Sequence, residues 1–490
     1  MISTHFPVLQ VALPLLAAPA CVVFRQATVT WLLALSVSCI SFLISISLLW
    51  QAYSTGEIRY ELGGWAAPWG IEYKVDVVNA FVLVIVSGMS SVVLVYARES
   101  LRYELGIRRI HLAYTGWLLC LTGLLGITVT GDAFNVFVFL EISSLSSYLL
   151  ISLGPDRRAL TAAFQYLVMG TIGATFILIG VGLLYMMTGT LNMADLSERI
   201  PAVSHTTTVH AAFAFLALGI ALKAAVFPLH YWLPNAYTYA PSAVTAFMAA
   251  SATKVSIYLL LRFFFDIFSE SFSLRTMRLN EILLIMGVVA IFSMSLVAIY
   301  QHNVKRMLAY SSVAQVGYMV LGIGLASPTG ITAAILHLFN HALMKGALFM
   351  ALGCMFYRIK SLELNDLAGI GRTMPWTTMA FVVGGLSLIG VPLTVGFVSK
   401  WYLILAALER DWWWLAVLVV ASSLLAVVYI WRVVEAAYFK PAPNTEVNEA
   451  PLSLLIPTWL LIVANVYFGI NAQLTIDFAS VAAADLLGLR

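Results

Sequence analysis

Long apolar runs follow one another along almost the whole chain, and short polar segments separate them. A helix needs about 20 predominantly apolar residues to cross the hydrocarbon core of a membrane. The pattern therefore predicts an all-α polytopic membrane protein. The runs predict fourteen spanning helices, near residues 7–24, 27–50, 76–97, 111–130, 133–153, 160–187, 210–235, 241–265, 281–300, 307–325, 330–355, 378–408, 413–438 and 451–470.

Composition agrees with this pattern. Of the 490 residues, 61% are hydrophobic and only 10% are charged, which leaves too little polar surface to cover a soluble globule of this size. The first run, Val8 to Phe24, has no basic residue before it and contains Pro14 and Pro19. We therefore expect a first span there rather than a cleaved signal peptide.

The distribution of Lys and Arg predicts how the spans are oriented. Fourteen of the 26 Lys and Arg residues, Lys305 among them, lie in loops after odd-numbered spans. Seven, Arg262 among them, lie in loops after even-numbered spans, and Arg490 ends the chain. Because cytoplasmic loops carry the excess of Lys and Arg, both termini are expected on the outer side of a bacterial or archaeal cytoplasmic membrane.

The four remaining lysines lie inside apolar spans, and no arginine is assigned there. They are Lys223, Lys254, Lys345 and Lys400. A buried lysine can lose its proton, whereas the pKa of arginine stays above about 12. Because an ionisable group inside a membrane is energetically costly, each of these lysines is a candidate functional residue.

One acidic residue, Glu141, lies near the middle of the fifth span, in GDAFNVFVFLEISSLSSYLL. Eight residues of helix at 1.5 Å each place it about 12 Å into the membrane. The serines that follow it offer hydroxyls that can hold water or pass protons, although serines also serve helix packing in membranes.

The seventh span contains Lys223 and is broken by Pro228 and Pro234. Proline removes a backbone donor and kinks a helix, and an interrupted span is tolerated only where it is buried in protein or lines a water-filled cavity. An ion path requires such a cavity, so Lys223 is predicted to handle protons. For His230, a hydrogen bond to the freed backbone is at least as good an interpretation as proton transfer.

Lys400 ends a similar segment, with Pro392 and Gly396, in the twelfth span. Two interrupted helices that each carry a lysine and lie five spans apart are typical of inverted repeats, in which spans four to eight correspond to spans nine to thirteen. The predicted parts are the three N-terminal helices in 1–110, a first half in 111–265, a second half in 281–438, and the last helix and tail in 451–490.

A row of titratable groups is predicted on one face of the eleventh span. His337 and His341 are one helical turn apart, and Lys345 lies one turn further. Lys254 lies mid-span among small residues that let helices approach closely, so we expect it to be a relay step as well. Two histidines at i and i+4 can also bind zinc, but neither a third ligand nor the glutamate of HExxH accompanies them.

Other chemistries find little support in the chain. The four cysteines are scattered without a CxxC pair, which argues against disulfide, zinc and iron–sulfur sites, and we expect no cofactor and no metal. No GxGxxG, GxxxxGK[ST] or GxSxG motif occurs. The net charge of +3 is too small to imply a nucleic-acid partner.

Taken together, these segments resemble the antiporter-like subunits shared by respiratory complex I, membrane-bound hydrogenases and Mrp-type multisubunit cation/proton antiporters. The matching segments are GDAFNVFVFLEISSLSSYLL, KAAVFPLHYWLPNAYTYAPSAV, HNVKRMLAYSSVAQVGYM, HLFNHALMKGALFM and GVPLTVGFVSKWYL. The resemblance covers nearly the whole chain and implies a fourteen-helix core with paired half-channels. It also implies that Glu141 pairs with Lys223, that Lys254 and the histidines connect the halves, and that Lys400 gates the far exit.

Within this family the chain is most similar to the D subunit of Mrp antiporters, judging by GGWAAPWGIEYKVD before the third span and GTLNMADL after the sixth. That similarity implies a proton-translocating subunit of a Na+/H+ antiporter, with other membrane subunits, protons and Na+ as partners. The alternative is a redox-driven complex of the complex I or hydrogenase type. Lys400 stands where one complex I subunit type would have glutamate, which points away from that type.

Overall fold

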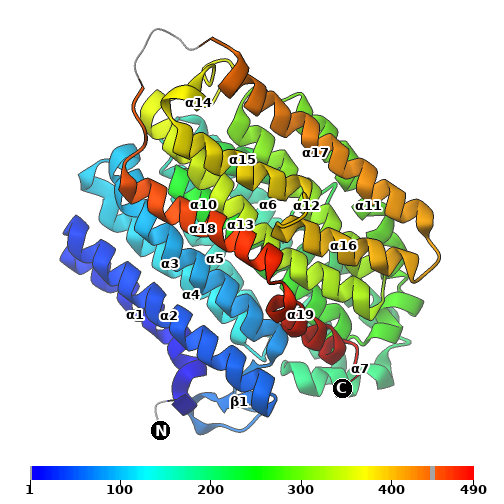
Figure 1. Ribbon diagram of the computed structural model, residues 1–490. Coiled ribbons are helices and arrows are strands. Elements are labelled where there is room, and N and C mark those ends of the chain that lie inside the picture. Colours follow the sequence, from blue (N-terminus) through cyan, green and yellow to red (C-terminus); the bar gives the residue numbers. More distant parts are fainter. Residues whose placement is uncertain (1–2, 442–446, 490) are drawn as a thin grey trace.

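The computed structural model describes residues 3–441 and 447–489, so the charge of Arg490 lies outside the described residues. Helices make up almost all of the structure and run side by side as a bundle of long rods (Figure 1). This arrangement confirms the predicted all-α polytopic class. The α-helices are α1 (Phe6–Phe24), α2 (Ala27–Thr55), α3 (Val77–Leu105), α4 (Ile110–Val129), α5 (Ala133–Ser152), α6 (Arg158–Thr188), α7 (Met193–Val203), α8 (Thr207–Lys223), α9 (Trp232–Tyr239), α10 (Ser242–Leu261), α11 (Leu279–Ile299), α12 (Val304–Gly324), α13 (Pro328–Ile359), α14 (Ile370–Thr373), α15 (Pro375–Ile389), α16 (Val395–Leu408), α17 (Trp413–Phe439), α18 (Leu452–Ile470) and α19 (Gln473–Leu486). The short 3-10 turns are η1 (Ser3–His5), η2 (Leu62–Gly64) and η3 (Ile107–Arg109), and the π-helical turns are η4 (Arg262–Ile267) and η5 (Phe272–Thr276).

Twelve helices of the described chain are long and apolar enough to cross a membrane. The shorter apolar helices α8, α15 and α16 belong to two broken rods, in which α8 leads into α9 and α15 leads into α16. These breaks fall in the predicted seventh and twelfth spans, where proline was expected to interrupt the helix. Counted as one span each, the broken rods would bring the total to fourteen, a number that stays a prediction.

The centre of the bundle consists of α10, α12 and α13, with α3 packed beside them (Figure 1). In α10 and α12 nearly every residue of the apolar window is buried, whereas in α1, α6, α11, α17 and α18 less than half is. The exposed side chains of the outer helices include large apolar ones such as Leu16, Val23 and Leu424. A surface of this kind is stable against lipid and unstable against water.

A short hairpin marks one end of the bundle. Strands β1 (Ile58–Glu61) and β2 (Glu72–Val75) pair antiparallel at the end where α1 begins and α19 lies, and α14 lies at the opposite end (Figure 1). Directly after β2, the carboxylate of Asp76 accepts the N–H of Asn79 at 3.1 Å, and the Asn79 side chain accepts the N–H of Asp76 at 2.8 Å. This reciprocal cap fixes the start of α3. The first and last α-helices thus share one end, as an even number of crossings requires.

One backbone bridge occurs twice in the bundle. Asp132, just before α5, bridges to Asn192, just before α7. Asn303, just before α12, bridges in the same antiparallel way to Glu363, which follows α13, and in both bridges the partners are 60 residues apart. Hydrogen bonds of 2.8 or 2.9 Å between backbone groups flank each bridge. Two halves of related structure would produce this duplication.

Candidate functional site

A tryptophan satisfies the backbone at the first broken helix. α8 ends at Lys223, and the chain turns through residues 224–231 before α9 begins. The Trp232 Nε1–H donates to the carbonyl of Leu222 at 3.0 Å, and its ring stacks on Tyr166 with the centroids 3.8 Å apart. The break therefore satisfies this carbonyl without using the lysine.

Lys223 faces α5, the helix that carries Glu141. Its Nζ donates to the hydroxyl of Ser144 at 2.6 Å. Glu141 lies one helical turn before Ser144, and its buried Oε1 has no hydrogen-bond partner among the described residues. Glu141 and Lys223 interact electrostatically, but they are absent from the direct ion pairs of the described chain. In this conformation a serine hydroxyl, and not the carboxylate implied by the resemblance, holds the lysine.

Lys254, His341 and Lys345 come together at the centre of the bundle, and each is fully buried. Lys254 Nζ donates to the carbonyl of Ala249 and, at 3.3 Å, to the hydroxyl of Thr253. His341 interacts electrostatically with both lysines, and neither of its ring nitrogens has a hydrogen-bond partner among the described residues. An imidazole in this state can accept a proton at one nitrogen and release one from the other.

His337 links this central group to the second broken helix. Its ring lies parallel to that of His341, with the centroids 5.9 Å apart. Its Nδ1 is 2.8 Å from the hydroxyl of Ser399, and its Nε2 is 3.0 Å from Oε1 of Gln315. Ser399 directly precedes Lys400, with which His337 also interacts electrostatically. The two histidines differ, because within the described chain one ring is fixed by two hydrogen bonds and the other by none.

Lys400 satisfies the backbone at the second broken helix, between α15 and α16. Its Nζ donates to the carbonyls of Leu388 at 3.1 Å and Ile389 at 2.8 Å, and to the hydroxyl of Ser423 at 3.0 Å. It also lies 4.9 Å from the centroid of the Tyr318 ring, a position that favours the charged amine. This lysine therefore has a structural role at the break.

Lys345 also bonds to a backbone group, and His230 lies in the first break. Lys345 Nζ donates to the carbonyl of Leu308 at 2.8 Å and to the hydroxyl of Ser311, both on α12. The ring of His230 stacks on Phe227 with the centroids 5.4 Å apart, and its Nδ1 has no hydrogen-bond partner among the described residues.

Two cations that the sequence places in loops are buried in the bundle. Arg262, only 4% exposed, lies in a candidate span and forms ion pairs with Asp76 at 2.7 Å and Asp266 at 2.9 Å. The prediction that the spans contain no arginine is therefore wrong. Lys305, only 7% exposed, lies in the first turn of α12. Signals for both exist in the sequence, because Arg262 and Asp266 have i, i+4 spacing and Asn303 is a good N-cap two residues before Lys305.

The assembled groups are amines, imidazoles, hydroxyls and one carboxyl, all of which exchange protons. Among the described residues, no group of three or more His, Cys, Asp and Glu side chains is arranged to hold a metal ion. The seven predicted residues fall into three groups. The first cluster is Glu141 and Lys223, the central row is Lys254, Lys345, His341 and His337, and the second cluster is centred on Lys400.

Comparison with known proteins identifies the family. The model of the family described as NADH:quinone oxidoreductase/Mrp antiporter, TM matches residues 130–426, which is more than half of the chain. The chain belongs to this family. The matched region contains all seven predicted site residues, and the resemblance drawn from the motifs is confirmed.

Relatives come from both branches of the family. NADH-quinone oxidoreductase subunit N of Desulforudis audaxviator is 40% identical over 490 residues, which cover 96% of this chain and 97% of that protein. The D subunit of the Na(+)/H(+) antiporter of Alkalihalophilus pseudofirmus is 31% identical over 447 residues, which cover 91% and 89%. A chain in the structure of the Mrp complex from a Dietzia species matches with a TM-score of 0.91 at 26% identity and covers 99% of this chain and 98% of that chain. This family member is thus a multi-pass membrane protein whose structural relatives are found in multisubunit complexes.

Proposed function

We propose that this chain is the proton-translocating subunit of a multisubunit monovalent cation/proton antiporter, with Na+ as the exchanged cation and other membrane subunits as partners. The observation that carries the proposal is the first cluster, in which a buried carboxyl oxygen of Glu141 without a partner among the described residues lies one turn from the serine that holds Lys223. Burial disfavours both charges, and each charge offsets part of that cost for the other. Loss of a proton by one group therefore favours proton uptake by the other.

The proposed path continues through Lys254 and the row of Lys345, His341 and His337 to Lys400. His341 supports this order because it interacts with both Lys254 and Lys345 and has both ring nitrogens free among the described residues. His337 supports the last step because it interacts with Lys400 across Ser399. Proton loss at Lys400 removes the charge that faces the Tyr318 ring.

The proposal includes two related halves, 111–265 and 281–438, and both termini on the outer side of the membrane. The duplicated bridge supports the two halves, because it joins matching helices in each. The excess of Lys and Arg in the loops predicted on the side opposite the two termini supports the orientation.

The test is cation-induced collapse of a pH gradient in inside-out vesicles from antiporter-deficient cells that express this chain with its neighbouring subunits. We expect Na+ to collapse the gradient with the wild-type chain and Glu141→Gln to abolish that collapse while leaving the complex assembled. Glu198→Gln, which removes the exposed carboxylate of Glu198 on α7, is the matched control and should be normal. Normal transport by Glu141→Gln would contradict the proposal.

A second candidate function is proton pumping in a redox-driven complex. It is favoured by the 40% identity to the Desulforudis oxidoreductase relative, against 31% to the Alkalihalophilus antiporter relative. The same vesicles separate the two functions. If no cation collapses the gradient but an added reductant generates one, the chain serves the redox-driven complex.

A further inference from the structure

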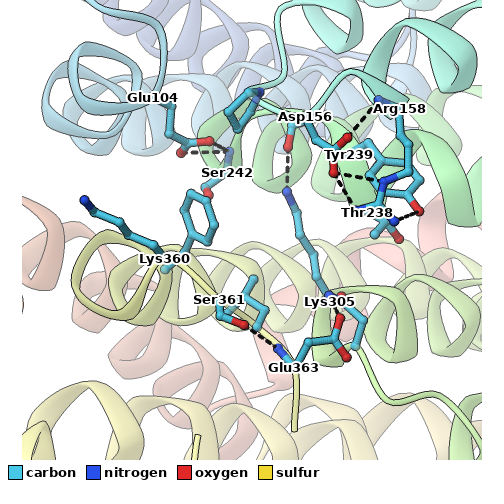
Figure 2. A pocket seen from close by; sticks show the side chains of 15 residues that line it. Glu104, Asp156, Arg158, Thr238, Tyr239, Ser242, Lys305, Lys360, Ser361 and Glu363 are labelled. Carbon is cyan, nitrogen blue, oxygen red and sulfur yellow. Dashed lines mark hydrogen bonds and ion pairs between the residues drawn. The ribbon is translucent and has the colours of Figure 1, made fainter. Parts of the chain in front are cut away.

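A cavity of about 310 Å³ opens at the end of the bundle opposite the β-hairpin, where loops from both halves meet. Its wall includes Glu104 at the end of α3, Ser242 at the start of α10 and Lys305 at the start of α12. In Figure 2 the Glu104 carboxylate points to Ser242, and the Lys305 side chain extends toward the segment between Tyr239 and Ser242. None of these residues belongs to the proposed path described above.

The acid and the base of this cavity have different surroundings. Glu104 is half-buried, and its two oxygens accept the backbone N–H of Ser242 at 3.1 Å each, while one also accepts the hydroxyl of Ser100 at 3.0 Å. Lys305 is buried, and its Nζ donates to the carbonyl of Ala240 at 2.5 Å. The two charges interact without a direct ion pair in the described structure. Both groups are therefore held in place by bonds that survive a change in their protonation.

The rim of the cavity carries a fixed ion pair. Arg158 and Asp156 lie 2.5 Å apart, and the hydrogen bond from the Arg158 guanidinium holds the pKa of the Asp156 carboxyl below its ordinary value. Glu363, on the opposite wall, accepts a hydrogen bond from the Asn303 side chain at 3.0 Å. Asp156 therefore stays ionised at the rim, and Glu104 is the acid of this cavity that interacts with Lys305.

α12 connects this cavity to the central row. Lys305, Leu308, Ser311 and Gln315 recur at spacings of three and four residues and therefore share one face of the helix. The Leu308 carbonyl and the Ser311 hydroxyl are the partners of Lys345, which lies beyond them. At 1.5 Å per residue, Lys305 is only about 5 to 9 Å along the helix axis from these two partners.

We propose that the cavity is a proton entrance for the second half, with Glu104 as the acceptor and Lys305 as the inner relay; this inference rests on the proposed function. Glu104 takes a proton from cavity water. The Lys305 ammonium releases a proton inward to the Ser311 hydroxyl, which passes its own proton to Lys345. Lys305 then regains a proton from Glu104, so the relay returns to its starting state.

The test measures initial transport rates in the inside-out vesicles for Glu104→Gln and Lys305→Gln, with Glu99→Gln as the matched control. Glutamine keeps one acceptor oxygen for the Ser242 N–H but takes up no proton at physiological pH. We expect both cavity variants to lower the rate by about tenfold, below the usual loss when an essential proton-transfer group is removed. Glu99 lies on the same helix and accepts the Tyr357 hydroxyl at 3.1 Å, so its variant should be normal.

A second measurement tests the entrance even if Glu104→Gln or Lys305→Gln does not assemble. Thr238→Cys places a thiol on the cavity wall of the folded complex, where a membrane-impermeant, positively charged methanethiosulfonate reagent can reach it. We expect this labelling to lower the rate severalfold in inside-out vesicles and to leave labelled wild-type vesicles unchanged. An unchanged rate in labelled Thr238→Cys overturns the entrance.

The two proposals fail in distinguishable ways. If Glu141→Gln is inactive but either assembled cavity variant keeps a normal rate, the entrance is wrong and the proposed function stands. If Glu141→Gln is active, the proposed function is wrong whatever the cavity variants do.

Discussion

The two broken helices place a lysine at the break and use it differently. At the first break the tryptophan in α9 satisfies the carbonyl of Leu222, and among the described residues Lys223 donates only to the hydroxyl of Ser144. At the second break Lys400 itself satisfies two carbonyls. The first lysine can change its partner without cost to the break, whereas the second cannot. Loss of transport on removing Lys223 therefore reflects the loss of the amine alone, whereas loss of transport on removing Lys400 also reflects an unsatisfied break.

Lys223 provides the largest expected effect. Lys223→Ala should lower transport by about a hundredfold or more, as expected for loss of an essential proton-transfer group. The complex should assemble normally, because Trp232 still satisfies the break. Initial rates and the amount of complex in the membrane are the measurements. Lys223→Arg, which keeps the charge but not the ability to lose a proton, should be equally inactive.

Lys400→Ala should also stop transport, and in addition it should destabilise the complex. Two carbonyls would lose a donor, at about 1–3 kcal/mol for each buried group left unsatisfied. The measurement is the melting temperature of the purified complex beside that of Lys223→Ala. Lys400→Arg should restore most of the stability and none of the transport. Equal melting temperatures for the two alanine variants would contradict the difference between the breaks.

The serines that contact the two lysines offer a finer comparison. Ser144→Ala removes the hydroxyl to which Lys223 donates and should lower transport by about tenfold, equivalent to about 1.4 kcal/mol in the barrier. Ser423→Ala removes one of three partners of Lys400 and should lower transport by less than about threefold. The two initial rates, measured in the same vesicles, decide the order. A larger effect at Ser423 would reverse our assignment of the roles.

Trp232→Phe should have the smallest effect on transport. The phenyl ring keeps the stack on Tyr166 but loses the Nε1–H that reaches Leu222. We expect a loss of about 1 kcal/mol in stability and a rate within about twofold of wild type. Thermal melting and initial rates check this. A rate as low as that of Ser144→Ala would mean that the first break needs its tryptophan for the chemistry too.

Most of the fold followed from apolar run length and from proline. Both breaks were predicted because proline cannot continue a helix, and the His337, His341 row was predicted because residues four apart share a helix face. The correspondence of spans four to eight with spans nine to thirteen remains a prediction. These features depend only on short stretches of sequence.

The missed features depend on contacts between distant segments. Arg262 is buried because Asp76, far from it in the sequence, neutralises it together with Asp266. Lys305 is buried because Ala240 supplies its acceptor. Hydropathy assigned both to loops, since a charge near the end of an apolar run looks the same whether protein or water surrounds it. The contact of Lys223 with Ser144 was missed because it also joins segments that are distant in the sequence.

The arginine that the sequence assigned to a loop also constrains motion. Arg262 joins the end of α10 to Asp76 at the start of α3, and arginine keeps its proton at physiological pH. Breaking a buried pair of this kind costs about 3–5 kcal/mol, so the joint stays closed while the inner groups exchange protons. Lys254 lies two turns away on the same helix, and Glu104 at the end of α3 holds the opposite end of that helix through the N–H of Ser242. α10 is therefore tied to α3 at both ends, on either side of Lys254.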